Sequence, residues 1–217
     1  MPSVTTDEIL AQVNDQLNDV GYIRWPKAEL LSYFNFAQKA VVLRRPDAFM
    51  VDIDDFVCVE GAKQTLPVDA LRLIDVPANA SGNVIRGPYD KNTLDNNYPS
   101  WRGGKTATEA ELYLYDERNP KTFYLYPGVV AGVQVNVIHS AAPPRVSMAE
   151  NDGGKLIDLD DIYENALTEW ILYRCYSKDA EFAANPQKAQ THLNAFKAQL
   201  GEKSQADGAV AGQPIKE

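Results

Sequence analysis

The sequence has little cysteine, no long apolar run and no basic excess, and each shortage excludes a class of protein. Its two cysteines, Cys58 and Cys175, form no metal-binding or redox spacing, so a reduced pair is expected. No stretch approaches the roughly 20 apolar residues that a membrane-spanning helix requires. The first residues lack the basic and apolar regions of a signal peptide, which predicts synthesis and folding in a cytoplasm.

Acidic charge predominates instead. Lys and Arg number 21 and Asp and Glu 30, which gives a net charge of −9. Tight binding to the outside of nucleic acid requires a basic stripe, and the sequence shows none. The 217 residues are 45% hydrophobic, which suffices for the core of one large domain or two small ones.

Two helices are predicted near the N-terminus. Thr5 followed by Glu8 is typical of a capping box, and apolar residues then recur at helical spacing up to a cap at Gly21. A second helix begins at Pro26 and ends before Pro46, with two arginines in its last turn.

From residue 48 to 155 the apolar period becomes that of strands. Short β-branched runs alternate with Gly, Pro, Asn and Asp clusters, which favours antiparallel sheets. The clearest pair of strands is 112–115 and 123–126. We expect one face of this pair to carry Leu112, Leu114, Phe123 and Leu125, and the opposite face to carry Tyr113, Tyr115, Tyr124 and Tyr126.

Helical spacing returns in the last third of the chain. One helix is predicted from an N-cap at Asp158 or Asp160 to about Ala184. Asn185 then opens another helix, which Gly201 ends, and the short junction implies a helical hairpin.

These patterns predict an α+β fold. A discontinuous four-helix bundle is formed from both ends of the chain, with an inserted antiparallel β-rich domain and a flexible C-terminal tail. The expected segments are 1–47 for the first half of the bundle, 48–155 for the β-rich insertion, 156–202 for the second half and 203–217 for the tail.

No catalytic or metal-binding arrangement stands out. Neither His139 nor His192 lies in a nucleophile motif. The acidic clusters at 52–55 and 158–161 lack calcium-loop spacing and fit a strand edge and a helix cap, so a hydrolase built on one of them is the least favoured hypothesis. The glycines at 103–104 lack the partners of a phosphate-binding loop. We predict no enzyme, metal or cofactor.

Tyrosine is unusually frequent, at 11 residues. Because tyrosine is enriched at protein interfaces, we predict that the four tyrosines of the paired strands contact another subunit or a partner. The alternative, that the chain's own helices cover them, stays open. A disordered tail can also become ordered on a partner. The candidate docking residues in the tail are Ala209, Val210, Pro214, Ile215 and Lys216.

A family pattern runs through most of the chain. It is carried by Arg24-Trp25-Pro26, Gln64-Thr65-Leu66-Pro67, Asn119-Pro120-Lys121-Thr122 and Asp161-Ile162-Tyr163-Glu164 with the segments that follow them. In these segments, between about 20 and 200, the sequence resembles the head-to-tail adaptor (connector) proteins of tailed bacteriophages, of the short-tailed type.

The resemblance implies a structural protein without enzymatic activity or cofactor. Such adaptors form a ring, commonly of twelve copies, that joins the portal to a tail nozzle or tail tube and continues the DNA channel. A C-terminal extension often docks on the portal. The implied location is the head–tail junction of the virion, after assembly in the host cytoplasm and without membrane contact. DNA would pass without specific binding, which suits an acidic chain because a basic lining would hold its phosphates.

A second hypothesis comes from a different class of protein. The chain would be a tail-associated binding module whose aromatic surface holds host glycans. Trp101 beside Asn96, Asn97 and Arg102 would suit the stacking of a sugar ring.

Overall fold

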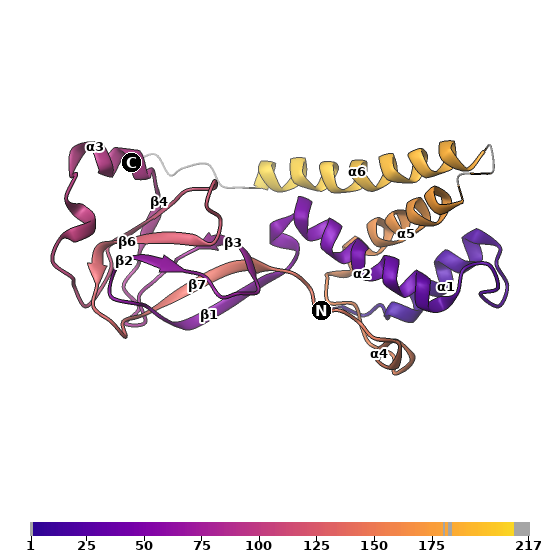
Figure 1. Ribbon diagram of the computed structural model, residues 1–217, viewed down its shortest axis with the longest axis horizontal. Coiled ribbons are helices and arrows are strands. Elements are labelled where there is room, and N and C mark those ends of the chain that lie inside the picture. Colours follow the sequence, from indigo (N-terminus) through magenta and orange to yellow (C-terminus); the bar gives the residue numbers. More distant parts are fainter. Residues whose placement is uncertain (1, 180, 182–183, 211–217) are drawn as a thin grey trace. The chain divides into compact units, whose positions relative to one another are not determined.

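The computed structural model describes residues 2–179, 181 and 184–210, with side chains described up to Gly201. These residues form six α-helices and two β-sheets, which confirms the α+β class (Figure 1). The chain divides into two compact units, Met1–Ala48 with Pro143–Glu217, and Phe49–Ala142. We refer to them as the helical unit and the β unit.

The helical unit is built around one central helix, α5 (Glu164–Lys178). The helices that pack against it are α1 (Thr6–Leu17), α2 (Lys27–Arg44) and α6 (Asn185–Val210). The shorter elements are α4 (Met148–Asp152) and the 3₁₀ turns η1 (Pro46–Ala48) and η3 (Asp161–Tyr163). Buried side chains of these helices, among them Ile9, Phe34 and Leu167, form the core of the unit.

The predicted capping box at the start of α1 is confirmed. The backbone N–H of Glu8 donates to Thr5 at 3.2 Å, and that of Thr5 donates to the Glu8 carboxylate at 2.7 Å. The end of α1 differs from the prediction, because the C-cap is Asn18 rather than Gly21. Asn18 has a positive φ of 52°, a conformation that asparagine adopts more readily than most residues.

The C-terminal hairpin is present with different helix ends. η3, capped by Asp160, precedes α5, and α5 ends at Lys178 rather than near 184. α6 continues through Gly201 to Val210, so the prediction of a helix end at Gly201 is wrong. A glycine inside a helix costs only about 1 kcal/mol relative to alanine, and Gly201 is followed by Glu202, Lys203, Gln205 and Ala206, which favour helix.

The β unit holds two sheets that share one core. Their strand orders are β1-β7-β3 and β2-β6-β5-β4. The strands are β1 (Met50–Val57), β2 (Gly61–Thr65), β3 (Ala70–Asp75), β4 (Arg86–Tyr89), β5 (Leu112–Tyr115), β6 (Thr122–Val129) and β7 (Gln134–Ala141). Apolar side chains from both sheets, including Leu73, Phe123 and Val137, form this core.

One strand departs from the antiparallel prediction. β4 pairs with β5 in parallel, whereas the other strand pairs are antiparallel. Parallel neighbours need a long crossover, and the chain between them supplies it. That crossover contains α3 (Lys91–Asn97) and η2 (Trp101–Gly103), neither of which was predicted.

Residues 143–155 belong to the helical unit, although the sequence analysis placed them in the β-rich segment. They contain α4, which begins with a second capping box between Ser147 and Glu150. The Asn35 side chain on α2 donates to the carbonyl of Val146 at 3.0 Å and accepts from its N–H at 2.8 Å. These bonds hold the segment against α2.

Candidate assembly surfaces

The paired Leu/Tyr strands form the predicted hairpin, with β5 antiparallel to β6. Its register places Leu112 opposite Tyr126 and Leu114 opposite Tyr124. Because opposed residues in an antiparallel pair share a face, each face carries two of the four tyrosines. The prediction of one leucine face and one tyrosine face is therefore wrong.

The face with Tyr113 and Tyr115 turns toward the core of the β unit. Tyr113 is 1% exposed, and its hydroxyl donates to the Asp75 carboxylate at 2.7 Å. Burial raises the pKa of Tyr113. The Tyr115 hydroxyl donates to the carbonyl of Pro120 at 3.2 Å. Tyr113 is a structural residue in this fold, and its assignment to an interface is corrected.

The opposite face is covered by α3 and η2. Trp101 lies with its ring centre 5.8 Å from that of Tyr124 and 6.4 Å from that of Tyr126, in edge-to-face geometry. Ala62 and Leu114 complete the buried part of this small cluster. Tyr124 and Tyr126 stay half-buried.

A network of polar side chains joins α3 to η2. The Asp95 carboxylate accepts the Trp101 indole N–H at 2.8 Å and a guanidinium N–H of Arg102 at 2.9 Å. Arg102 holds the pKa of Asp95 below its usual value. The Arg102 guanidinium also lies 4.5 Å from the centre of the Trp101 ring. These side chains thus satisfy one another's hydrogen-bonding groups, which is consistent with a structural role for the contact.

Burial of Trp101 bears on the glycan hypothesis. Trp101 is 5% exposed, because side chains of β2, α3 and the hairpin enclose it. A sugar ring needs an open aromatic face for stacking, and Trp101 offers none in this fold. Asn96, Asn97 and Arg102 are exposed beside it without that platform.

The acidic clusters do not gather around a site. Asp52, Asp54 and Asp55 lie exposed along β1, and Asp160 caps η3. Within the described residues, no three His, Cys, Asp or Glu side chains come close enough to hold a metal ion.

The histidines lie in different surroundings. His139 is buried on β7, and burial lowers its pKa. His192 on α6 stacks on Tyr176 and lies 2.7 Å from the Glu169 carboxylate, which links α6 to α5. Cys58 and Cys175 are buried and unpaired, and burial raises the pKa of their thiols to about 11 and about 12.

The β unit also has a cavity of about 510 Å³ beside β4. Glu109 and Glu111 line it together with Arg86. Glu109 accepts a hydrogen bond from the Asn83 side chain at 2.8 Å, which fixes it to the loop before β4.

The candidate docking residues of the tail lie partly beyond the described chain. Ala209 and Val210 fall in the last turn of α6, whose side chains there are not described. Pro214, Ile215 and Lys216 lie outside the described residues.

Sequence reasoning missed two apolar features of the helical unit. One is a loop between α1 and α2 that exposes Val20 and Ile23. The other is a groove beside η3 that Ile162 and Leu200 help to line. A pair of aliphatic residues in a loop carries no periodic signal, and the groove forms from two distant segments.

Comparison with known proteins identifies a family. The model of a protein family described as SU10 adaptor protein matches residues 4–215, a span that covers both units. No curated protein matches the chain. Among the described helices, none has the length and apolar character needed to cross a bilayer.

Proposed function

Because the chain belongs to the SU10 adaptor protein family of phage structural proteins, we propose that its copies form a ring that joins the portal to the tail. The ring is dodecameric, belongs to a short-tailed phage and lies at the head–tail junction. Its partners are the portal protein and a tail nozzle or tail tube protein. The observation that carries the proposal is the family match over residues 4–215, which includes α6 as well as both units.

The charge of the chain suits a component of a DNA channel. With a net charge of −9, a ring of such chains would repel DNA phosphates more than it attracts them. A channel that releases DNA must not bind it tightly, and basic linings bind it through counterion release. The proposed ring therefore extends the channel and lets DNA pass without specific binding.

α6 is the element proposed to reach the portal. It has 26 residues against 15 in α5, which correspond to lengths of about 39 and about 22 Å. Among the side chains of α6 that the structure describes, those of Ala189, Phe196 and Leu200 are buried. The turns of α6 after Gly201 lead to the proposed docking residues Ala209, Val210, Pro214, Ile215 and Lys216.

The helical bundle, the β-rich insertion and two tyrosines also have roles in the proposed ring. The segments 1–47 and 156–202 act as the two halves of a four-helix bundle, which carries the β-rich insertion. Tyr124 and Tyr126, which are half-buried, contribute a subunit or partner contact.

The test is binding to the portal ring encoded with this protein, by sedimentation and electron microscopy. We expect the full chain to add a ring of density at one pole of the portal, and a chain that ends at Lys203 to lose it. The matched control is a full-length chain in which residues 204–217 are scrambled. We expect it to add no ring of density either, because the proposed docking depends on the sequence of the tail. Portal rings that stay bare with the full chain would overturn the adaptor role.

A further inference from the structure

The strand β1 forms one edge of its sheet, and the outer side of this edge is open. Among the described strands, β1 pairs with β7 alone. The N–H of Ala141 donates to the carbonyl of Phe49 at 3.1 Å, which makes these two residues a hydrogen-bonded pair. Because such pairs alternate along an antiparallel ladder, the backbone groups of Met50 and Asp52 point away from β7. No backbone group among the described residues bonds to them.

The composition of β1 favours pairing with a further strand. Its eight residues include Val51, Ile53, Phe56 and Val57, which are β-branched or aromatic, and contain neither proline nor glycine. Segments of this composition associate edge to edge when their net charge is low. Met50 and Val57, at the two ends of the strand, are 51% and 60% exposed. β1 thus combines an open backbone with apolar side chains that reach solvent.

Two other sheet edges in the β unit are protected in ways that β1 is not. β4 is four residues long and contains Pro88, which has no N–H to donate. The edge of β3 is occupied in part, because the N–H of Leu73 donates to the carbonyl of Pro120 at 3.2 Å. β1 has instead a shift in register between Ile53 and Phe56, which interrupts the edge without covering it.

Three carboxylates stand along this open edge. Asp52, Asp54 and Asp55 are exposed, and none of them forms an ion pair with a described residue. β7, the neighbouring strand, carries no Lys or Arg. The Asn136 side chain on β7 lies 3.5 Å from the Asp54 carboxylate, but it brings no charge. The negative charge of β1 is therefore not compensated on its own strand or on the strand beside it.

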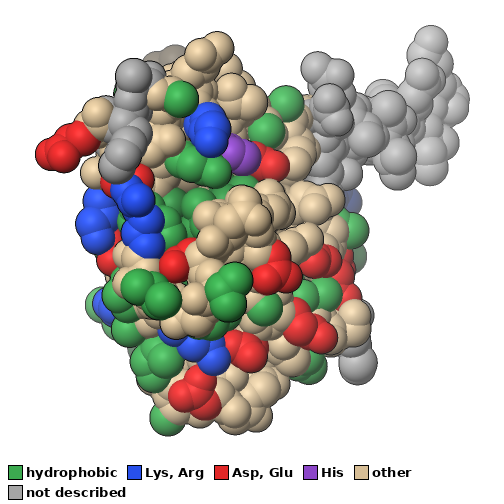
Figure 2. Space-filling model, turned by 90° about the vertical axis from the view of Figure 1, so that its right-hand side faces the viewer, with side chains coloured by type: hydrophobic (Ala, Val, Ile, Leu, Met, Phe, Trp, Pro, Cys, Tyr) green, Lys and Arg blue, Asp and Glu red, His purple; other side chains and the backbone are tan. Residues whose placement is uncertain are grey.

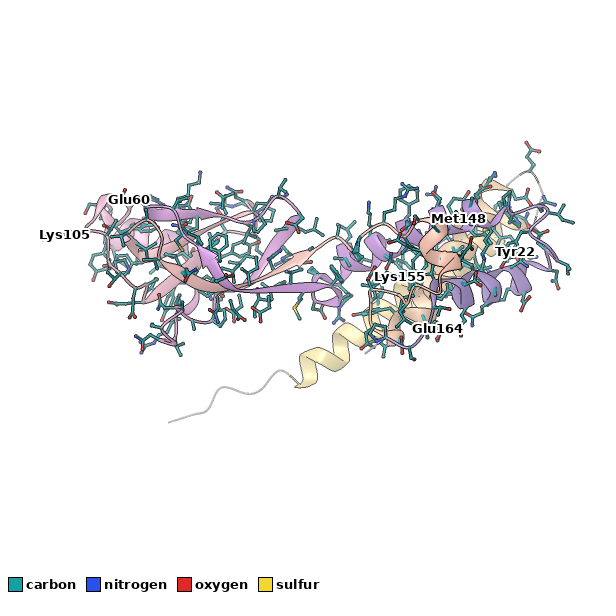
Figure 3. All side chains as sticks on the ribbon, turned by 90° about the horizontal axis from the view of Figure 1, so that it is seen from below. Tyr22, Glu60, Lys105, Met148, Lys155 and Glu164 are labelled. Atoms are coloured by element: carbon teal, nitrogen blue, oxygen red, sulfur yellow. The ribbon has the colours of Figure 1, made fainter. Side chains whose placement is uncertain are left out.

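The surroundings of β1 add no free cation to this edge. Arg72 on β3 lies on the far side of β7, and its guanidinium is paired with Glu117 at 3.1 Å. The helical unit, in contrast, shows acidic and basic side chains beside one another in Figure 2. The next charged residue after β1 in the chain is Glu60, which is labelled in Figure 3 and is also acidic.

We propose that Asp52, Asp54 and Asp55 prevent the open edge of β1 from pairing with β1 of a second copy. In an antiparallel pair of two β1 strands centred between residues 52 and 55, aspartates of one copy lie opposite aspartates of the other. Like charges directly opposite one another destabilise a strand pair. The inference does not depend on the proposed ring. It implies that copies of the chain, in a ring or free, contact one another through surfaces other than this edge.

Removal of the three charges tests the proposal. The full chain carries Asp52→Asn, Asp54→Asn and Asp55→Asn, and its self-association is compared with that of the wild type by analytical ultracentrifugation over a range of concentrations. We expect the variant to associate at least about tenfold more tightly, because the like-charge pairs across the two strands are lost. Amide hydrogen exchange locates the contact, since the N–H groups at positions 50 and 52 should gain protection in the associated state.

Two further variants lose the same number of charges and serve as controls. Asp15→Asn with Asp69→Asn and Glu111→Gln removes three exposed carboxylates away from β1, and it should associate like the wild type. The second control repeats the β1 variant with Asp52→Pro in place of Asp52→Asn. Proline removes an N–H that points to solvent, so the fold should tolerate it while pairing of the edge is blocked. This control should also associate like the wild type.

Three results would overturn the proposal. One is a β1 variant whose self-association equals that of the wild type. Another is an equal gain in association for the control with its substitutions away from β1, which would make net charge the cause. The third is a gain without protection of the N–H groups at positions 50 and 52, which would place the new contact on another surface.

Discussion

Gly87 lies against the ring of Tyr113 with no room for a side chain. A Cβ atom on Gly87 would lie 2.5 Å from a ring carbon of Tyr113 and 2.7 Å from its backbone oxygen. Both distances are well inside van der Waals contact, and the backbone oxygen cannot move without shifting β5. The parallel pairing of β4 with β5 thus depends on a glycine at this position.

Gly87→Ala should therefore lower the free energy of unfolding by about 1–3 kcal/mol, the usual cost of overpacking. Urea unfolding followed by circular dichroism measures it as a lower midpoint with an unchanged slope. Gly103→Ala is the matched control, because a Cβ there meets no atom within 4 Å, and it should change stability by less than about 0.5 kcal/mol. Equal losses from both variants would contradict the steric argument.

At the scale of elements, local sequence signals predicted the positions of helix starts and strand pairs better than they predicted how these elements pack together. The Thr5–Glu8 capping box and the Leu/Tyr hairpin depend on neighbours in sequence, and both are confirmed. The assignment of hairpin faces failed because it depends on register. A shift of one residue moves every side chain of a strand to the other face, and side-chain type alone does not fix the register.

The cover formed by α3 and η2 explains why the tyrosines of the hairpin could not be placed from sequence. The pattern of residues 91–103 has no apolar period, so nothing predicted an element there. Trp101 nevertheless packs on Tyr124 and Tyr126 and closes one face of the sheet. The sequence analysis left open whether the tyrosines form an interface or are covered by the chain's own helices; Tyr113 is instead buried in the core between the two sheets.

Tyr124→Asp combined with Tyr126→Asp tests the strength of this cover. Both rings pack against Trp101, so the double variant should lose at least about 2 kcal/mol of stability, from two aromatic pairs and from charges set beside an apolar cluster. Chemical unfolding with tryptophan fluorescence measures the loss. Tyr98→Asp is the control, since Tyr98 is 61% exposed on the same segment and should be tolerated. An unchanged midpoint for the double variant would show that the cover contributes nothing.

At the scale of the whole molecule, the two units differ in how the chain forms them. The β unit is continuous, from Phe49 to Ala142, whereas the helical unit is assembled from both ends of the chain. The division into helical ends and a β-rich middle follows from the change in apolar period. The groove near Ile162 could not be predicted in this way, because its lining comes from two segments that only folding brings together.

This connectivity predicts which part of the chain folds by itself. Residues 49–142 contain both sheets and their shared core, so this fragment should unfold cooperatively in urea. Residues 1–48 lack α5, the helix against which α1 and α2 pack, and should show no cooperative transition alone. Adding a fragment of residues 143–217 supplies α5 and should restore helical circular dichroism. Gly87→Ala placed in the 49–142 fragment should lower its midpoint as it does in the full chain. If that fragment lacks a cooperative transition, the β unit depends on the rest of the chain and its own core is not sufficient.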